Sequence, residues 1–119
     1  MLILIAHGSR DPAWRGSLEA LARKVQSSSP KEEVRLAFMQ FTGPTLPEVV
    51  EAGWERETRR FRILPLFMAS AGHVDKDIRP LVEDLAQRFP GGTLELLTPV
   101  GENPLFHELV KNIADNDRS

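Results

Sequence analysis

The sequence predicts a single α/β domain over residues 1–119, with a four-stranded parallel sheet and helices on both faces of that sheet. Short apolar segments alternate with segments in which apolar residues recur at helical spacing, and this alternation occurs four times along the chain. Glycine, proline and serine separate these segments, as is typical of turns. A length of 119 residues is the length expected of one domain.

The first two units each pair a strand with a helix. The run Leu2–Ala6 is apolar without alternation, which indicates a strand buried on both faces, and Asp11 followed by Pro12 predicts the start of a helix that ends at the Ser27–Pro30 segment. A second strand is expected over Val34–Phe41. Thr45 and Glu48 have the spacing of a capping box and predict the start of a helix. The apolar face of this helix consists of Leu46, Val49, Val50, Gly53 and Trp54.

The last two units repeat this pattern. A third strand is expected over Phe61–Phe67 and a weaker fourth strand over Thr93–Thr98. Each is followed by a helix, with apolar faces formed by Ile78, Leu81, Val82, Leu85, Ala86 and Phe89 in one, and by Leu105, Phe106, Leu109, Val110 and Ile113 in the other. Because right-handed crossovers must place helices on both faces of only four strands, we expect the strand order 2-1-3-4.

Composition excludes several classes of protein. The 15 Lys and Arg against 17 Asp and Glu give a net charge of −2, without the basic excess of a duplex-binding protein. The absence of cysteine excludes disulfides, thiolate metal sites and a cysteine nucleophile. The apolar run Met1–Ala6 is far shorter than the roughly 20 residues of a membrane span and lacks the basic flank of a signal peptide. We therefore expect a cytoplasmic protein that binds neither nucleic acid nor membrane.

Three polar residues are expected to meet at the edge of the sheet where ligands bind. His7 directly follows the first strand. Gln40, at the end of the second strand, comes 33 residues after His7, and His73 comes 33 residues after Gln40. The strand order reverses between the first and third strands, and open α/β sheets bind ligands at that point. The alternative is that each histidine only hydrogen-bonds a neighbouring turn. His107 is expected to be an ordinary surface or half-buried residue of the last helix.

Imidazole suits two kinds of chemistry, since it binds divalent transition metals and accepts protons near neutral pH. No pair of ligands has the spacing of a closed zinc site, and no glycine-rich nucleotide motif is present. The segment from His7 to Arg10 leaves a further alternative open, which is phosphate-ester chemistry at a helix N-terminus.

Basic side chains lie near the same edge, and arginine forks suit carboxylate ligands. These candidates for binding an anionic substrate are Arg10, Arg15, Lys76 and Arg79. The alternative is that they are solvated charges offset by the neighbouring Asp11, Asp75 and Asp77.

Several motifs together resemble one family. The chain contains Ala6-His7-Gly8-Ser9-Arg10-Asp11-Pro12, Pro44-Thr45-Leu46-Pro47-Glu48, Leu64-Pro65-Leu66-Phe67 and Ala71-Gly72-His73-Val74 followed by Asp77-Ile78. In this order they resemble the small, single-domain sirohydrochlorin cobaltochelatases and ferrochelatases of the CbiX type, which are class II chelatases. The resemblance extends along nearly the whole chain.

The resemblance implies insertion of Co²⁺ or Fe²⁺ into sirohydrochlorin, an octacarboxylate tetrapyrrole, in cobalamin or sirohaem biosynthesis. It implies a chelatase-like fold, no ATP or organic cofactor, and a homodimer. It also implies that His7 and His73 bind the metal and act in catalysis, with Arg10, Arg15, Lys76 and Arg79 facing the substrate carboxylates.

Gln40 departs from the family pattern, in which many relatives have glutamate. A glutamine side chain cannot ionise and offers only a neutral carbonyl oxygen and an amide. Gly43 likewise replaces an acidic residue that is frequent in the family. The alternative function is therefore a non-catalytic metal-binding or tetrapyrrole-binding protein of the same fold.

Overall fold

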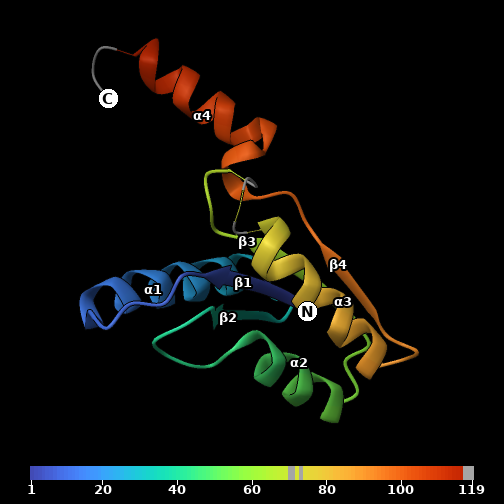
Figure 1. The fold of residues 1–119 in the computed structure, drawn as a ribbon. Helices are drawn as coiled ribbons and strands as arrows, with labels where there is room; N and C mark the ends of the chain where they lie inside the picture. The colour runs from blue at the N-terminus through green and yellow to red at the C-terminus, as the bar shows by residue number, and fades with distance from the viewer. Residues whose placement is uncertain (70–71, 73, 117–119) are drawn as a thin grey trace.

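A computed structural model describes residues 1–69, 72 and 74–116 of the chain. Its four strands form one parallel sheet in the order β2-β1-β3-β4 (Figure 1), which confirms the order expected from the sequence. The strands are β1 (Leu2–Ala6), β2 (Val34–Phe38), β3 (Arg60–Pro65) and β4 (Thr93–Leu96). The change of direction in strand order falls between β1 and β3, as in other doubly wound sheets.

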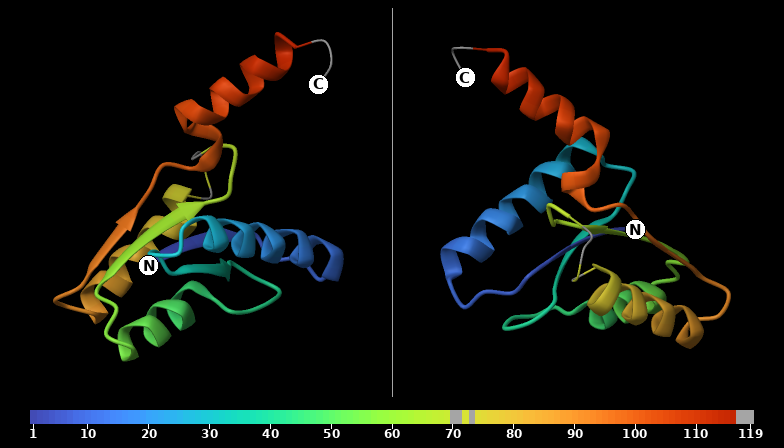
Figure 2. Two further views of the ribbon diagram at one scale, coloured as in Figure 1. Left: turned by 180° about the vertical axis from the view of Figure 1, so that it is seen from behind. Right: turned by 45° about the horizontal axis from the view of Figure 1, so that its top comes forward.

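Helices lie on both sides of the sheet. Helix α1 (Pro12–Ser28) lies on one face, and α2 (Leu46–Glu55) and α3 (Arg79–Arg88) lie on the other (Figures 1 and 2). A π-helical turn, η1 (Val74–Ile78), precedes α3, and a short 3-10 turn, η2 (Val100–Glu102), precedes α4 (Pro104–Ala114). Only the start of α4 lies near the remainder of the molecule (Figures 1 and 2).

The helix starts agree with the capping residues in the sequence. Asp11 accepts a hydrogen bond from the Ala13 N–H at 2.9 Å, and Asn103 accepts one from the Leu105 N–H at 2.8 Å. Thr45 and Glu48 form the expected reciprocal capping box at the start of α2. These caps satisfy N–H groups that have no partner inside a helix.

The main core lies between the sheet and the face that carries α2 and α3. Alternate residues of the strands point to this side, and they are almost fully buried together with the inner faces of both helices. The buried cluster comprises Ile3, Ile5, Ala37, Leu46, Val49, Val50, Phe61, Ile63, Phe67, Val74, Ile78, Val82 and Leu85. This core fixes β1 and β3, whose carboxyl ends form the candidate site.

Three strands are shorter than the sequence predicts. β2 ends at Phe38 and not at Phe41, β3 ends at Pro65 and not at Phe67, and β4 ends at Leu96. The strand β1, which pairs with both β2 and β3, ends at Ala6, so the residues beyond the ends of β2 and β3 have no β1 partner to continue the ladder. Phe41 also has a φ of +68°, which ends any extended conformation there. The apolar residues past the strand ends therefore line the edge of the sheet.

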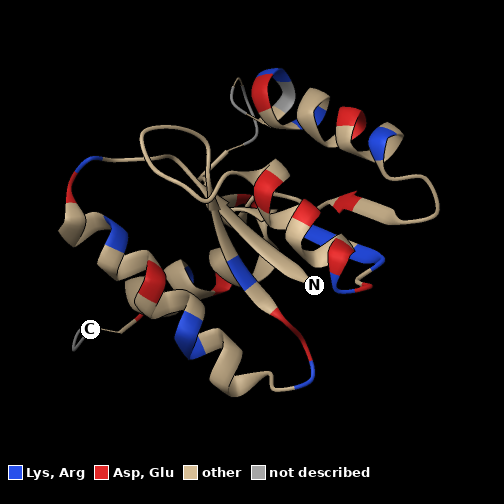
Figure 3. Ribbon diagram, turned by 90° about the horizontal axis from the view of Figure 1, so that it is seen from below, with Lys and Arg blue, Asp and Glu red and all other residues tan. Residues whose placement is uncertain are grey.

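The surface carries both signs of charge. Acidic and basic residues are interspersed along the helices in the view of Figure 3, in keeping with the small net charge of −2. Within residues 1–69, 72 and 74–116, no helix is long and apolar enough to cross a membrane.

Glu32 carries one pH-dependent contribution to stability. The N-terminal ammonium of Met1, 3.0 Å from the Glu32 carboxylate, holds the pKa of Glu32 below its ordinary value against the opposing effect of burial, and Arg62 at 3.6 Å lowers it a little further. A carboxylate whose pKa is lowered by folding stabilises the folded state above its unfolded-state pKa and loses that effect as the pH falls through the folded-state pKa.

We therefore expect Glu32→Gln to lower the melting temperature at about pH 7, with the difference from the unmodified protein shrinking toward about pH 3. Thermal unfolding followed by circular dichroism at a series of pH values measures this effect. Glu83→Gln, at an exposed position of α3, is the matched control and should change little at either pH. A difference that stays constant with pH would exclude an ionic contribution from Glu32.

Candidate functional site

His7 lies where the strand order reverses. It directly follows β1, is half-buried, and its ring centroid is 4.4 Å from that of Phe67, which follows β3. Phe67 is itself 8% exposed, so it provides a fixed apolar wall beside the imidazole. The position predicted for His7 at the carboxyl edge of the sheet is confirmed, and the imidazole has the packing needed to hold one orientation.

The chain segments after β1 and β2 meet at Gly8 and Gln40. The Met39 N–H donates to the Ala6 carbonyl at 2.9 Å, which continues the contact between the two strands past the end of β2. A Cβ placed on Gly8 would lie 1.2 Å from the Gln40 carbonyl oxygen, so only glycine permits this approach. The sequence therefore correctly predicts that Gln40 lies next to the His7 segment, and Gln40 is exposed there.

Arg10 and Phe41 line an open hollow beside His7. The Arg10 guanidinium carbon lies 5.2 Å from the centroid of the Phe41 ring, which is 59% exposed. Together with Gly8 and Ser9 they surround a hollow of about 330 Å³. A second hollow, of about 320 Å³, continues along the start of α1 to Arg15 and Thr42. A cation beside an exposed aromatic ring suits a ligand that is both apolar and negatively charged.

Arg15 has structural partners on the loop that follows β2. Its guanidinium donates to the Thr42 hydroxyl and to the Gly43 carbonyl, the latter at 2.8 Å, and it lies 3.5 Å from Glu19. It also lies over the ring of Phe38 at 5.2 Å. These contacts join α1 to the loop after β2, so Arg15 supports the wall of the hollow. Its contact with substrate stays a prediction.

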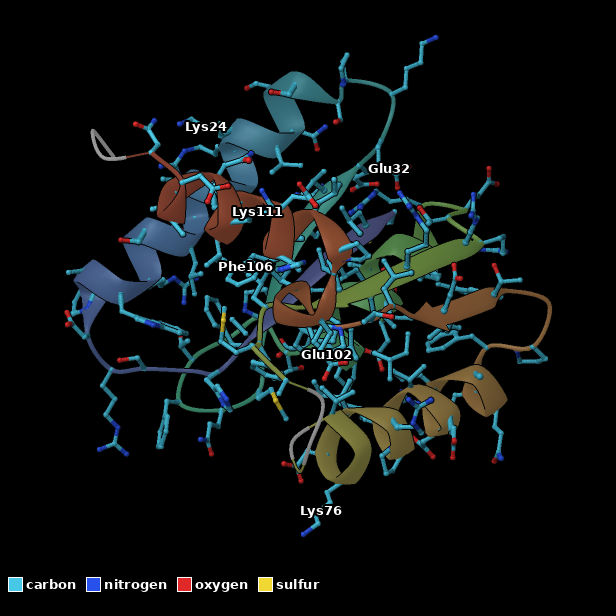
Figure 4. All side chains as sticks on the ribbon, turned by 90° about the horizontal axis from the view of Figure 1, so that it is seen from above. Lys24, Glu32, Lys76, Glu102, Phe106 and Lys111 are labelled. Atoms are coloured by element: carbon cyan, nitrogen blue, oxygen red, sulfur yellow. The ribbon has the colours of Figure 1, made fainter. Side chains whose placement is uncertain are left out.

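The remaining predicted residues come from the segment between β3 and α3. His73 lies outside the described residues. Lys76 is exposed on η1 and extends away from the body of the molecule (Figure 4), and Arg79 is exposed at the start of α3. Val74 and Ile78 are 1% and 0% exposed, so they anchor this turn in the core. His107 is exposed on α4, which agrees with the surface position that the sequence allows for it.

Sequence reasoning does not single out Phe41 as a site residue. The sequence predicts a strand through Phe41 because it continues an apolar run, whereas the structure exposes its ring and places it at the hollow.

The described residues contain no group of three or more histidine, cysteine, aspartate or glutamate side chains placed to hold a metal ion. The chemical capacity of this part of the edge therefore comes from one imidazole, a neutral amide, a guanidinium and an exposed aromatic ring. Such a set can bind an anionic ring system, accept a proton and hold a divalent ion loosely.

Fold and site together define an α/β protein of the doubly wound type with a ligand site at the switch between β1 and β3. The CbiX family model matches residues 1–116, and the chain belongs to the CbiX family. The four-stranded architecture is chelatase-like, as the solved structures below show.

Curated relatives share part or most of the chain. A sirohydrochlorin cobaltochelatase of Methanocaldococcus jannaschii is 35% identical over 81 residues, covering 68% of this chain and 57% of that protein. A sirohydrochlorin cobaltochelatase of Methanosarcina barkeri is 29% identical over 118 residues, covering 92% of this chain and 89% of that protein. The match to the Methanocaldococcus protein and to two further archaeal cobaltochelatases spans little more than half the length of each.

Solved structures agree with the fold. A putative cobalamin biosynthesis CbiX protein from Marinobacter aquaeolei superposes with a TM-score of 0.82 at 31% identity, covering 96% of this chain and 92% of that one. The sirohydrochlorin chelatase SirB from Bacillus subtilis, solved with cobalt, gives a TM-score of 0.81 at 22% identity and is covered over 47% of its length. The second likeness concerns the fold alone.

Proposed function

We propose that this chain inserts Co²⁺ or Fe²⁺ into sirohydrochlorin, without ATP or an organic cofactor, in cobalamin or sirohaem biosynthesis. The observation that carries the proposal is the CbiX match over residues 1–116, together with an imidazole held at the carboxyl edge of β1. We propose the cytoplasm as its compartment, because the chain has no cysteine and the run Met1–Ala6 lacks the basic flank of a signal peptide.

The proposed roles follow from the charge balance of the reaction. A divalent ion entering the macrocycle replaces two pyrrole N–H protons, so insertion needs proton acceptors and ligands that release the metal. His7 can serve both needs because neutral imidazole binds divalent metals and accepts protons near pH 7. His73 is proposed as the second imidazole. Arg10 is proposed to bind substrate carboxylates, while the exposed ring of Phe41 contacts the macrocycle. Lys76 and Arg79 are proposed as further carboxylate contacts.

An absorbance assay tests the proposal, because metallation changes the spectrum of the macrocycle. Sirohydrochlorin is mixed with Co²⁺, Fe²⁺ or Ni²⁺, with and without the protein, and initial rates are compared. The proposal predicts acceleration with Co²⁺ or Fe²⁺. Rates equal to the protein-free reaction with all three metals would overturn it.

Gln40 favours a second candidate, a metal-binding or tetrapyrrole-binding protein that does not catalyse insertion. Where many relatives have a carboxylate, this chain offers a neutral amide next to the His7 segment. Tight binding of sirohydrochlorin or Co²⁺, measured by titration calorimetry, with no acceleration in the assay would support this candidate.

The substitution Gln40→Glu is expected to raise the initial rate of Co²⁺ insertion several-fold at about pH 8. It adds a charged oxygen ligand and a proton acceptor beside His7, where imidazole is largely neutral at that pH. Gln40→Ala, which removes the amide without adding charge, is the matched control and should give no gain. If both variants have the rate of the unmodified protein, the side chain at position 40 does not contact the metal path.

A homodimer is also part of the proposal. One four-stranded domain covers a single side of a flat macrocycle, and SirB, which has the same fold, is about twice as long as the segment it shares with this chain. A second copy would supply the other side of the cleft.

A further inference from the structure

Phe41 combines two features that are unfavourable in a protein without its ligand. Its aromatic ring is 59% exposed and does not belong to the buried core. Its φ of +68° places the backbone in the left-handed region, where a bulky side chain is a rare outlier. Backbone strain of this kind persists only where the surrounding structure enforces it, and it is concentrated at functional sites. The conformation of Phe41 therefore needs a cause and a use.

Glu57 shows what a local cause looks like. It is the second residue other than glycine with a positive φ in the described part of the chain, at +72°. It directly follows the C-cap of α2, and its N–H donates to the Trp54 carbonyl at 3.0 Å. Helices commonly end with one residue in this conformation. Phe41 follows β2 and ends no helix, so this explanation does not apply to it.

Backbone hydrogen bonds fix both ends of the loop that carries Phe41. The Met39 N–H donates to the Ala6 carbonyl at 2.9 Å, which holds the start of the loop against the end of β1. The Phe38 N–H donates to the Pro44 carbonyl at 2.9 Å, which closes the loop on itself. The chain must reverse its direction between these points, and a left-handed residue makes such a sharp turn possible.

Arg15 holds the two residues that come directly after Phe41. Its guanidinium donates to the Thr42 hydroxyl and to the Gly43 carbonyl, the latter at 2.8 Å. Glu19, one turn further along α1, lies 3.5 Å from the same guanidinium and orients it. Because Arg15 belongs to a helix of 17 residues, these contacts join the loop to a rigid element.

The ring of Phe41 is covered in part by Arg10 and is otherwise open. The Arg10 guanidinium carbon lies 5.2 Å from the ring centroid, within the range of a cation–π contact. The open hollow of about 330 Å³ lies beside both residues. A flat ligand in this hollow can stack on the ring while Arg10 binds a carboxylate at the ligand's rim.

We propose that Arg15 is a positioning residue, which holds Phe41 in its strained conformation so that the ring stacks on one face of the tetrapyrrole. The strain is present before the ligand binds, so the ring needs no rearrangement and little ordering when the macrocycle arrives. Arg15 then strengthens binding through Phe41 and not through a substrate carboxylate of its own. The inference rests on the tetrapyrrole substrate of the proposed function and needs neither the metal nor proton transfer.

Titration of metal-free sirohydrochlorin into the protein measures binding without metal insertion. Phe41→Gly is expected to raise the dissociation constant about 10-fold or more, because the stacking surface is lost. The same variant is expected to keep or raise the melting temperature, because glycine adopts a positive φ without strain. Phe41→Tyr keeps the ring and should keep the dissociation constant within a few-fold.

Glu57→Gly is the matched control for the relief of strain. It replaces a residue of similar φ that lies after α2, so it should keep or raise the melting temperature and leave the dissociation constant unchanged. Unchanged affinity in Phe41→Gly would overturn the stacking role. A lower melting temperature in Phe41→Gly would show that the ring stabilises the fold, and it would overturn the inference as well.

A double-mutant cycle tests whether Arg15 acts through Phe41. Arg15→Met removes the guanidinium and is expected to raise the dissociation constant several-fold. In the Phe41→Gly background the same substitution should cause no further loss, since both changes affect one ring. A direct contact between Arg15 and a substrate carboxylate would give the same loss in both backgrounds and would overturn the positioning role. Lys24→Met, at an exposed position of α1, controls for the loss of one charge and should change neither constant.

The outcomes separate this inference from the proposed activity. A protein that binds sirohydrochlorin through Phe41 but inserts no metal would leave the inference standing and remove the chelatase function. A protein that inserts metal, and whose affinity is indifferent to Phe41→Gly, would do the reverse. Absence of binding by the unmodified protein would overturn both.

Discussion

Replacement of His7 by alanine is expected to lower the initial rate of Co²⁺ insertion into sirohydrochlorin by about 10²–10⁴-fold, the usual contribution of a positioned acid–base group. The imidazole lies at the carboxyl end of β1, where it packs against Phe67 at 4.4 Å. Loss of that ring contact is expected to cost only about 0.5–1.5 kcal/mol of stability. His73→Ala is expected to cause a similar loss of rate.

Two controls separate chemistry from packing. His7→Phe keeps an aromatic ring beside Phe67 but has no nitrogen, so it should retain the melting temperature and lose the activity. His107→Ala removes an exposed histidine of α4 and should change neither. An active His7→Phe variant would show that the imidazole acts only as a packing group and would remove it from the mechanism.

The fold could be predicted from sequence because each element carries its own signals. Apolar runs such as Leu2–Ala6 and caps such as Asp11 act locally, and the order of four parallel strands follows from the handedness of their crossovers. Strand ends were less predictable. Phe41 and Phe67 continue apolar runs, but they line the site edge, and nothing local distinguishes that role from a place in a strand.

The site was predictable in position and less so in contacts. The equal spacing of His7, Gln40 and His73 along repeated units predicts that all three lie at one edge. The approach of Gly8 to Gln40 bears this out for His7 and Gln40, and His73 lies outside the described residues. The engagement of Arg15 with Thr42 and Gly43 depends on the path of the loop after β2, which no local pattern specifies.

Substitution of Gly8 by alanine is expected to damage both stability and activity, whereas the same substitution at Gly16 is expected to stabilise the protein. A Cβ on Gly8 would lie 1.2 Å from the Gln40 carbonyl oxygen and 2.3 Å from its carbon. Both atoms belong to the backbone, so no side chain can move aside and the segments after β1 and β2 must separate. Forced overpacking of this kind typically costs about 1–3 kcal/mol or more.

Gly16 provides the matched control because its substitution by alanine adds the same methyl group. It lies within α1, and a Cβ there would meet nothing within 4 Å. Alanine in a helix interior is favoured over glycine by roughly 0.5–1 kcal/mol, so Gly16→Ala should raise the melting temperature and keep the activity. Denaturant unfolding and the absorbance assay measure both effects.

Since Gly8 directly follows His7, the Gly8→Ala variant should lose more activity than its loss of stability explains. A Gly8→Ala protein with full activity would show that the two segments can separate without displacing the imidazole, and that their close approach serves packing alone.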